Sequence, residues 1–145
     1  MKQFYSYDEF SKDIKELSNQ IKNYSPDALI SIARGGMTMG HFISEELEMR
    51  EIYTINSVHY EKDKKLDYFI IKNIPDLSNH KKIILLDDIS DSGETLQHII
   101  KILQKQYPQI EIKTATIFYK NTSVLIPDFK LKEATKWIVF FWEKN

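Results

Sequence analysis

The sequence contains no cysteine among its 145 residues. Disulfide bonds and thiolate metal sites are therefore excluded, and the composition agrees with a reducing compartment. No apolar run approaches the roughly 18 residues that a membrane-spanning helix needs, and the N-terminal stretch lacks the long apolar core of a secretory signal. We therefore expect a cytoplasmic protein with no membrane partner.

The sequence also lacks an excess of charge of either sign. The formal net charge is -1, so we expect no global attraction to nucleic acid or to an anionic membrane. Any site for a polyanion must be local. Hydrophobic residues make up 42% and charged residues 28%, the balance of a soluble globular protein. The length of 145 residues predicts a single domain over 1–145.

Apolar spacing predicts helices that alternate with strands. Asp8 is suited to cap a first helix, because apolar residues then recur at a helical period as far as Ile21. Further helices are predicted over 37–48 and around 96–103. The predicted strands are 28–32, 52–58, 82–89, 112–119 and 136–142. This alternation predicts an α/β fold with a doubly wound, mostly parallel sheet flanked by helices.

The most informative stretch is "IILLDDISDSGET", residues 83–95. Its apolar run predicts a strand that is buried on both faces and ends at Asp87 and Asp88, followed by a polar turn and a helix. Backbone N–H groups at the start of a helix attract an anion, so the turn is suited to one phosphate group. The two acids would repel a bare phosphate, but carboxylates accept hydrogen bonds from a sugar diol or hold Mg²⁺.

A second polar stretch, "ARGG" (33–36), follows the strand predicted at 28–32. The carboxyl ends of parallel strands meet at one edge of a sheet, and ligands of doubly wound folds bind there. An arginine and two glycines are suited to a second phosphate group that backbone amides approach closely. Together the two stretches predict a site for a ribose with a phosphate at one end and a diphosphate at the other.

This combination resembles the type I phosphoribosyltransferase family, and the likeness extends over most of the chain. "IILLDDISDSGET" is similar to the family's phosphoribosyl diphosphate signature, and "ARGG" resembles its diphosphate loop. Lys120 in "IFYKN", followed by "KWIVFFWE", resembles the purine pocket of bacterial xanthine-guanine and hypoxanthine (6-oxopurine) phosphoribosyltransferases. Phe141 departs from the proline that is usual at its place in the bacterial relatives.

The resemblance implies a role for each residue of the two stretches. Asp87 and Asp88 would bind the ribose hydroxyls, directly or through Mg²⁺, and with Asp91 they are the expected catalytic acids. The 5′-phosphate would be held by Asp91, Ser92, Gly93, Glu94 and Thr95. The diphosphate would be bound by Ala33, Arg34, Gly35 and Gly36, with a non-proline cis bond preceding Arg34.

The resemblance also implies a purine pocket. Lys120 would donate a hydrogen bond to the 6-oxo group of the base, and Trp137 would stack on the ring. The backbone of Ile138, together with Glu143, would read the far edge. Asp91 would lie near the purine N7, where it could take or share a proton.

Residues 59–68 interrupt the alternation of helices and strands. They have no apolar periodicity and hold six charged residues, which predicts a solvated, mobile connection. Their place in the sequence matches the hood loop of the family. The resemblance implies that Tyr60 and the nearby lysines close over the diphosphate during turnover.

The implied function is purine salvage. The protein would be a Mg²⁺-dependent pentosyltransferase that moves the phosphoribosyl group from 5-phosphoribosyl 1-diphosphate (PRPP) to guanine, xanthine or hypoxanthine. Its partners would be these small molecules rather than nucleic acid, and relatives form homodimers or homotetramers. One alternative is a regulator of the same fold that binds nucleotide and RNA. A signalling receiver domain is disfavoured, because its acid pair lies on the first strand.

Overall fold

The structure is a computed structural model that describes residues 1–62 and 66–144, including their side chains except those of 59–62 and 66–68. The helices are α1 (Tyr7–Lys22), α2 (Met37–Glu46) and α3 (Glu94–Gln106). The strands are β1 (Lys2–Tyr5), β2 (Ala28–Ala33), β3 (Ile52–Lys62), β4 (Leu66–Lys72), β5 (Lys82–Ser90), β6 (Glu111–Tyr119), β7 (Lys132–Glu133) and β8 (Trp137–Phe140).

Six of the strands form one sheet in the order β4-β3-β2-β5-β6-β7. Neighbouring strands run parallel except for β3 and β4, which pair antiparallel. The remaining strands, β1 and β8, pair parallel in a separate two-stranded sheet. The prediction of a mostly parallel sheet is confirmed.

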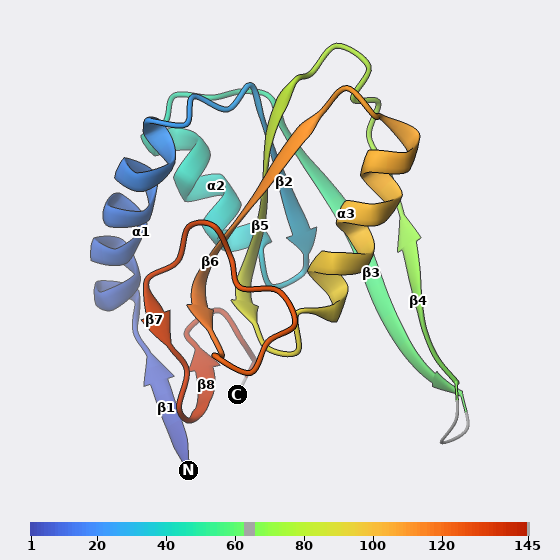
Figure 1. Cartoon of the computed structure of the whole chain (residues 1–145). Helices are drawn as coiled ribbons and strands as arrows, with labels where there is room; N and C mark the ends of the chain where they lie inside the picture. The colour runs from blue at the N-terminus through green and yellow to red at the C-terminus, as the bar shows by residue number, and fades with distance from the viewer. Residues whose placement is uncertain (63–65, 145) are drawn as a thin grey trace.

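The central strand β5 explains why helices cover both faces of the sheet. Ile83 and Leu85 pack in a core with α3, whereas Ile84 and Leu86 pack in a second core with α1 and α2. All four side chains are fully buried. Because alternate side chains of a strand point to opposite faces, an unbroken apolar run requires cover on both. Figure 1 shows α1 and α2 on one side of the sheet and α3 on the other.

Ser6 caps α1, in place of the predicted Asp8. Its hydroxyl accepts a hydrogen bond from the Glu9 backbone N–H at 3.2 Å, and the Glu9 carboxylate accepts one from the Ser6 N–H at 2.9 Å. This reciprocal pair satisfies two amides at the helix start, and Asp8 lies within the first turn. The predicted apolar face is buried through Phe10, Ile14, Leu17 and Ile21.

Residues 59–68 were predicted to be a connection between elements, but the part of them that the structure describes lies in strands. Strand β3 continues to Lys62 and β4 begins at Leu66, with antiparallel pairing from Asn56↔Lys72 to Lys62↔Leu66. Backbone hydrogen bonds hold such a ribbon whatever its side chains are, so charged residues do not prevent it. Figure 1 shows β3 and β4 extending past the end of α3.

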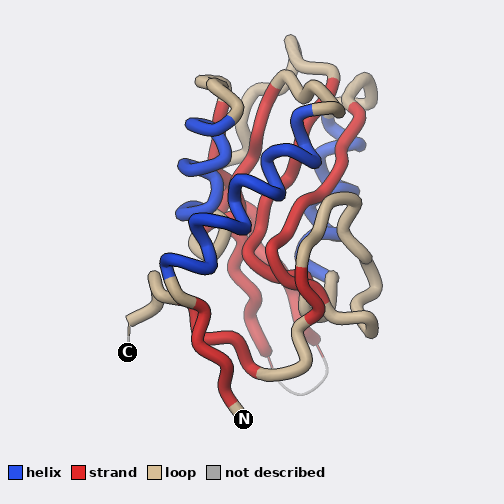
Figure 2. The backbone as a smooth tube through the Cα atoms, turned by 90° about the vertical axis from the view of Figure 1, so that its left-hand side faces the viewer, coloured by secondary structure: helices blue, strands red, loops and turns tan. Residues whose placement is uncertain are grey.

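The β1–β8 pair stands at the sheet edge where the predicted functional residues gather. Figure 1 shows the ends of β2, β5 and β6 pointing toward the region of β8. Figure 2, seen from the α1 side, shows that both termini lie at this same end of the molecule. Two short strands were not predicted from the sequence: β1, which has four residues, and β7, which has two.

Candidate active site

The last residues of β5 bring two carboxylates to the edge of the sheet. Asp87 and Asp88 directly follow a buried run and are themselves partly buried. Asp87 lines a cavity of about 90 Å³ together with the loop that follows it. Asp88 lines two other cavities, of about 210 and 660 Å³. The two acids therefore face different spaces, as expected for successive residues of a strand.

The surroundings of this acid pair disfavour its negative charge. Burial raises the pKa of Asp87 well above its usual value, and repulsion from Asp88 adds to the effect. Burial also raises the pKa of Asp88 to about 6, with a further contribution from the charge of Glu143. Among the described residues, no lysine or arginine forms an ion pair with either carboxylate. The pair is suited to a ligand that brings a cation or hydroxyl donors.

The loop after β5 lines the cavity of about 90 Å³ at the start of α3. Gly93 precedes the helix with a φ of 82°, a left-handed conformation that other residues rarely adopt. A Cβ at this position would also collide with Ser123 and Leu125. The Ser92 carbonyl accepts a hydrogen bond from the Val124 N–H at 2.8 Å, which holds the loop against the segment after β6. Backbone amides at the helix start are suited to an anion here.

The loop after β2 packs directly against the acid pair. The non-proline peptide bond that precedes Arg34 is cis, as the resemblance implied. A Cβ on Gly35 would lie 2.5 Å from Asp88 Oδ2, and one on Gly36 would lie 2.5 Å from the Leu86 carbonyl oxygen. Only glycine allows the two strand ends to approach this closely. Arg34 is exposed and lines the cavity of about 660 Å³.

The cavity of about 210 Å³ lies beside β8. Its lining includes all four residues predicted to hold a purine, namely Lys120, Trp137, Ile138 and Glu143. Asp88 and Asp91 line it as well, so the structure brings the predicted purine-binding residues together with two of the three predicted catalytic acids. Trp137 is 66% exposed, so its ring is available for stacking. The remaining lining residues were not predicted from the sequence; they are Ile89, Lys136 and Phe140.

Lys120 and Asp91 form an ion pair in this lining, with Lys120 Nζ 2.7 Å from Asp91 Oδ1. Their side chains are 39% and 59% exposed. The Lys120 N–H donates to the Ser90 carbonyl at 3.0 Å, which joins the ends of β5 and β6. Exposed ion pairs contribute at most about 1 kcal/mol, so an entering ligand can replace this one at small cost. The pair offers one hydrogen-bond donor and one acceptor side by side.

Three predicted site residues do not line these cavities. Ala33 and Gly36 contribute backbone to the loop after β2, and Glu94 is exposed in the first turn of α3. The Tyr60 side chain and residues 63–65 lie outside the part of the chain that the structure describes. The hood loop therefore stays a prediction.

Phe141, the departure from the family pattern, does not line the cavity of about 210 Å³ either, which is called the purine-side cavity below because all four predicted purine-binding residues line it. Its ring packs edge-on against Tyr7 and at a steep angle against Phe10, at centroid distances of 5.6 and 5.3 Å. The next residue, Trp142, stacks on Phe140 at 4.7 Å. An aromatic cluster thus supports the back of β8, and only local packing could have identified it.

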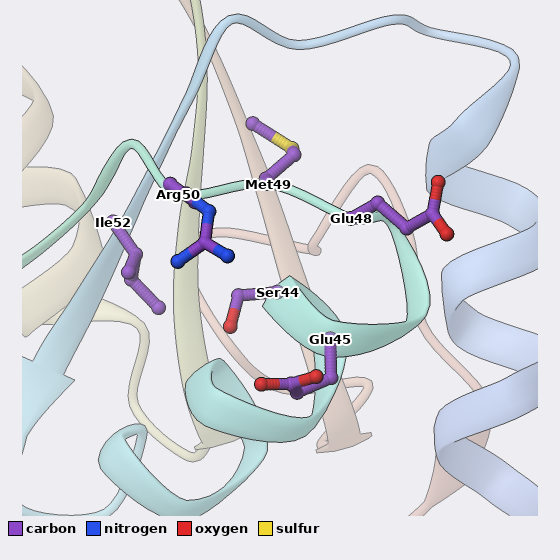
Figure 3. Close-up of a pocket in the computed structure, with 6 residues that line it drawn as sticks. All are labelled: Ser44, Glu45, Glu48, Met49, Arg50 and Ile52. Carbon is purple, nitrogen blue, oxygen red and sulfur yellow. The ribbon is translucent and has the colours of Figure 1, made fainter.

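A further pocket, of about 550 Å³, lies at the opposite end of the sheet (Figure 3). The register pairs Ile52 with Leu29, so the start of β3 lies beside the start of β2. The lining therefore belongs to the amino ends of the strands, away from the acid pair, and consists of Ser44, Glu45, Glu48, Met49, Arg50 and Ile52. None of these residues is a predicted site residue.

The described residues hold no group of three or more histidine, cysteine or acidic side chains arranged for a metal ion. A metal at the acid pair would therefore need further ligand atoms from a substrate or from water. In residues 1–62 and 66–144, no helix has both the length and the apolar character to cross a membrane.

The sequence is similar to those of known phosphoribosyltransferases. The model of the phosphoribosyl transferase domain family matches residues 1–144. A xanthine-guanine phosphoribosyltransferase from Cereibacter sphaeroides is 26% identical over 147 residues, which cover 95% of this chain and 84% of that protein. One from Roseobacter denitrificans is 29% identical over 153 residues, which cover 95% and 83%.

Solved structures agree. The xanthine-guanine-hypoxanthine phosphoribosyltransferase of Helicobacter pylori superposes with a TM-score of 0.92 and 38% identity, covering 99% of this chain and 94% of that one. A purine phosphoribosyltransferase from Pyrococcus horikoshii superposes with a TM-score of 0.87 and 28% identity, covering 99% and 95%.

Proposed function

The chain belongs to the phosphoribosyl transferase domain family, and from this premise we propose that it transfers the phosphoribosyl group of PRPP to a 6-oxopurine. The bond between C1 of the ribose and the diphosphate oxygen breaks, and a bond from C1 to a ring nitrogen of the base forms. The base loses one proton, and the products are a nucleoside 5′-monophosphate and diphosphate.

One observation carries this proposal: Asp88 borders two cavities of different character. One of them holds Trp137 and Lys120, which are suited to a planar base with an oxo group. The other holds Arg34 and Gly35, which are suited to a diphosphate. A ribose at the acid pair would have its reacting carbon between the incoming base and the leaving group, which is the arrangement that a transfer requires.

The donor would be held at three points. The loop 91–95 would bind the 5′-phosphate through backbone amides and the Ser92 and Thr95 hydroxyls. Asp87 and Asp88 would accept hydrogen bonds from the ribose hydroxyls. Arg34 and the amides of its loop would bind the diphosphate.

The acid pair fits the Mg²⁺ that the family generally uses with PRPP. Carboxylate oxygens are the ligands that Mg²⁺ prefers, and the raised pKa values of Asp87 and Asp88 mark two acids without a compensating cation among the described residues. Asp87 and Asp88 would hold the ion together with substrate oxygens and water. Bound there, Mg²⁺ would neutralise charge that develops on the leaving diphosphate.

The acceptor base would replace the ion pair of Lys120 and Asp91. Lys120 would donate to the 6-oxo group, and Asp91 would accept a proton from, or share one with, the imidazole edge of the purine. Trp137 would stack on the ring, and Ile138 and Glu143 would read its far edge. The transition state resembles an oxocarbenium ion, so these residues act through positioning and exclusion of water.

A direct assay tests the proposal. The protein is incubated with PRPP, Mg²⁺ and each of guanine, hypoxanthine and xanthine, and the nucleoside 5′-monophosphate is measured. We expect product with at least one base, and loss of product when Asp87 and Asp88 are both replaced by asparagine in a protein that still folds. Absence of product with every 6-oxopurine would contradict the purine assignment.

No observation favours the alternative of an RNA-binding regulator, because the similar proteins of known name are phosphoribosyltransferases. The homodimer or homotetramer and the cytoplasmic location expected from the sequence remain predictions.

A further inference from the structure

The purine-side cavity is lined by a second lysine that the family resemblance does not assign. Lys136 immediately precedes β8 and lines the cavity with Ile138 and Phe140. These three residues alternate along the chain, and residues two apart in an extended segment share one face. Ile138 and Phe140 are only 6% and 3% exposed, whereas Lys136 is exposed, so its ammonium is accessible to a ligand that enters the cavity.

The ammonium group of Lys136 has no partner within the described residues. The other ammonium of the lining, on Lys120, is paired with Asp91 at 2.7 Å. Lys136 forms no hydrogen bond, ion pair or ring contact across residues 1–62 and 66–144. Two ammonium groups repel each other, so both cannot serve the same oxo group of a base. With Lys120 on the 6-oxo group, Lys136 is left for another acceptor.

We propose that Lys136 is a specificity-determining residue that donates a hydrogen bond to the oxo group at C2 of xanthine. This inference rests on the proposed function, in which Lys120 takes the 6-oxo group. A lysine ammonium carries three donors and no acceptor. Xanthine presents an acceptor at C2, guanine presents an amino donor, and hypoxanthine presents only hydrogen. At C2, Lys136 therefore has a partner in one base of the three.

The charge of Lys136 acts in the same direction. Xanthine is the most acidic of the three bases, and a nearby cation favours the charged form of an acid. With guanine, the ammonium would instead face an amino group, and two hydrogen-bond donors cannot bond to each other. The protein should therefore use xanthine better than a site with a neutral residue at position 136 would.

The test compares the wild-type protein with Lys136→Met and Lys136→Arg, measuring kcat and KM for xanthine, guanine and hypoxanthine at saturating PRPP. Methionine keeps an unbranched side chain of similar length without the charge. We expect Lys136→Met to lose at least about tenfold in kcat/KM for xanthine, mostly through KM, because a hydrogen bond to a charged group contributes this much. The value for hypoxanthine should change little, and the value for guanine should stay the same or rise, because the ammonium no longer faces its amino group. Lys136→Arg should retain the preference for xanthine.

Lys101→Met, on the exposed surface of α3, is the matched control and should leave all three bases unaffected. Calorimetric binding of xanthosine and guanosine 5′-monophosphates to the same variants gives a measurement that does not depend on turnover. An equal loss for all three bases, or no loss for xanthine, overturns the role of Lys136. A wild-type protein that converts none of the bases overturns the proposed function instead.

Discussion

At the scale of single residues, the acid pair depends on a close approach by the loop after β2. The Cβ of any residue at position 35 would lie 2.5 to 2.8 Å from the three terminal atoms of the Asp88 side chain. The Asp88 side chain would then have to turn away from the cavities of about 210 and 660 Å³ that it lines. The glycine at position 35 thus leaves room for the carboxylate, in addition to the role proposed for its backbone at the diphosphate.

We predict that Gly35→Ala lowers kcat/KM strongly while the protein remains folded. Overpacking of this kind costs about 1 to 3 kcal/mol in free energy of unfolding, and the displaced Asp88 would no longer meet the ribose. The effect on activity should therefore exceed the effect on stability. Steady-state kinetics and urea unfolding of the same preparation provide the two measurements.

Gly40→Ala is the matched control for this prediction. A Cβ on Gly40 would collide with the buried Ser31 hydroxyl between α2 and the sheet, and its nearest atoms belong to Ser31 and Ile52 rather than to either acid. Gly40→Ala should therefore destabilise the protein and leave the kcat/KM of the folded fraction unchanged. Adding Ser31→Ala should restore part of the lost stability. Equal loss of activity in both glycine variants would show that Gly35 acts only through stability.

At the scale of secondary structure, the sequence predicts most reliably the helices and strands with a buried face, because burial sets the spacing of their apolar residues. The run before Asp87 and the spacing of Leu96, Ile99 and Leu103 correctly predicted the strand and the helix on either side of the loop 91–95, which is proposed to bind phosphate. The strand predicted over 52–58 is the first part of β3, but its continuation to Lys62 and strand β4 were missed, because backbone pairing rather than apolar spacing holds them. The contribution of Lys136 was missed for a related reason: the face of β8 that lines the cavity is decided by tertiary packing.

The start of α1 gives a prediction at this scale. Ser6→Ala removes the hydroxyl that accepts the Glu9 N–H, and loss of such a cap costs about 1 kcal/mol. Asp8→Ala should cost less, because Asp8 contributes only its charge within the first turn. Thermal unfolding of both variants at neutral pH measures the difference. A larger loss of stability in Asp8→Ala than in Ser6→Ala would instead support Asp8 as the cap, as predicted from the sequence.

The same cap should respond to pH. The hydrogen bond from the Ser6 N–H is the main cause that lowers the pKa of Glu9 below its usual value. A carboxyl whose pKa is lowered by folding stabilises the protein above its unfolded pKa, and this contribution is lost as the pH falls through the folded pKa. The stability lost in Glu9→Gln should therefore be largest at neutral pH and should shrink on acidification. A difference that does not depend on pH would contradict this origin.

At the scale of the whole molecule, the two sheets divide the proposed substrates between them. The six-stranded sheet carries the acid pair and both loops that are proposed to bind phosphate, whereas the small sheet carries Trp137 and Ile138. Tyr5 connects the two sheets. It is 1% exposed, its ring meets Phe118 of β6 edge-on at 5.1 Å, and its hydroxyl donates to Asp13 Oδ2 at 2.6 Å.

Lys132 of β7 completes this connection, with its Nζ 2.9 Å from the same Asp13 oxygen. Strand β1, helix α1 and strand β7 therefore meet at one buried carboxylate, which is only 7% exposed. Burial and then the hydrogen bond to Asp13 raise the pKa of the Tyr5 hydroxyl, so it stays a neutral donor over the whole working range of pH.

Tyr5→Phe should loosen the small sheet and thereby affect the base more than PRPP. Loss of a buried hydrogen bond to a charged group costs about 1.5 to 3 kcal/mol, so unfolding should require less denaturant. The KM for the base should rise several-fold, because Trp137 and Ile138, which are proposed to bind the base, lie in the small sheet. The KM for PRPP should stay close to that of the wild type, because the residues proposed to bind PRPP lie outside the small sheet. Tyr24→Phe is the control, since its hydroxyl also donates to a carboxylate, that of Glu111, but away from β8. Parallel changes in both KM values would show that the two sheets act as one unit.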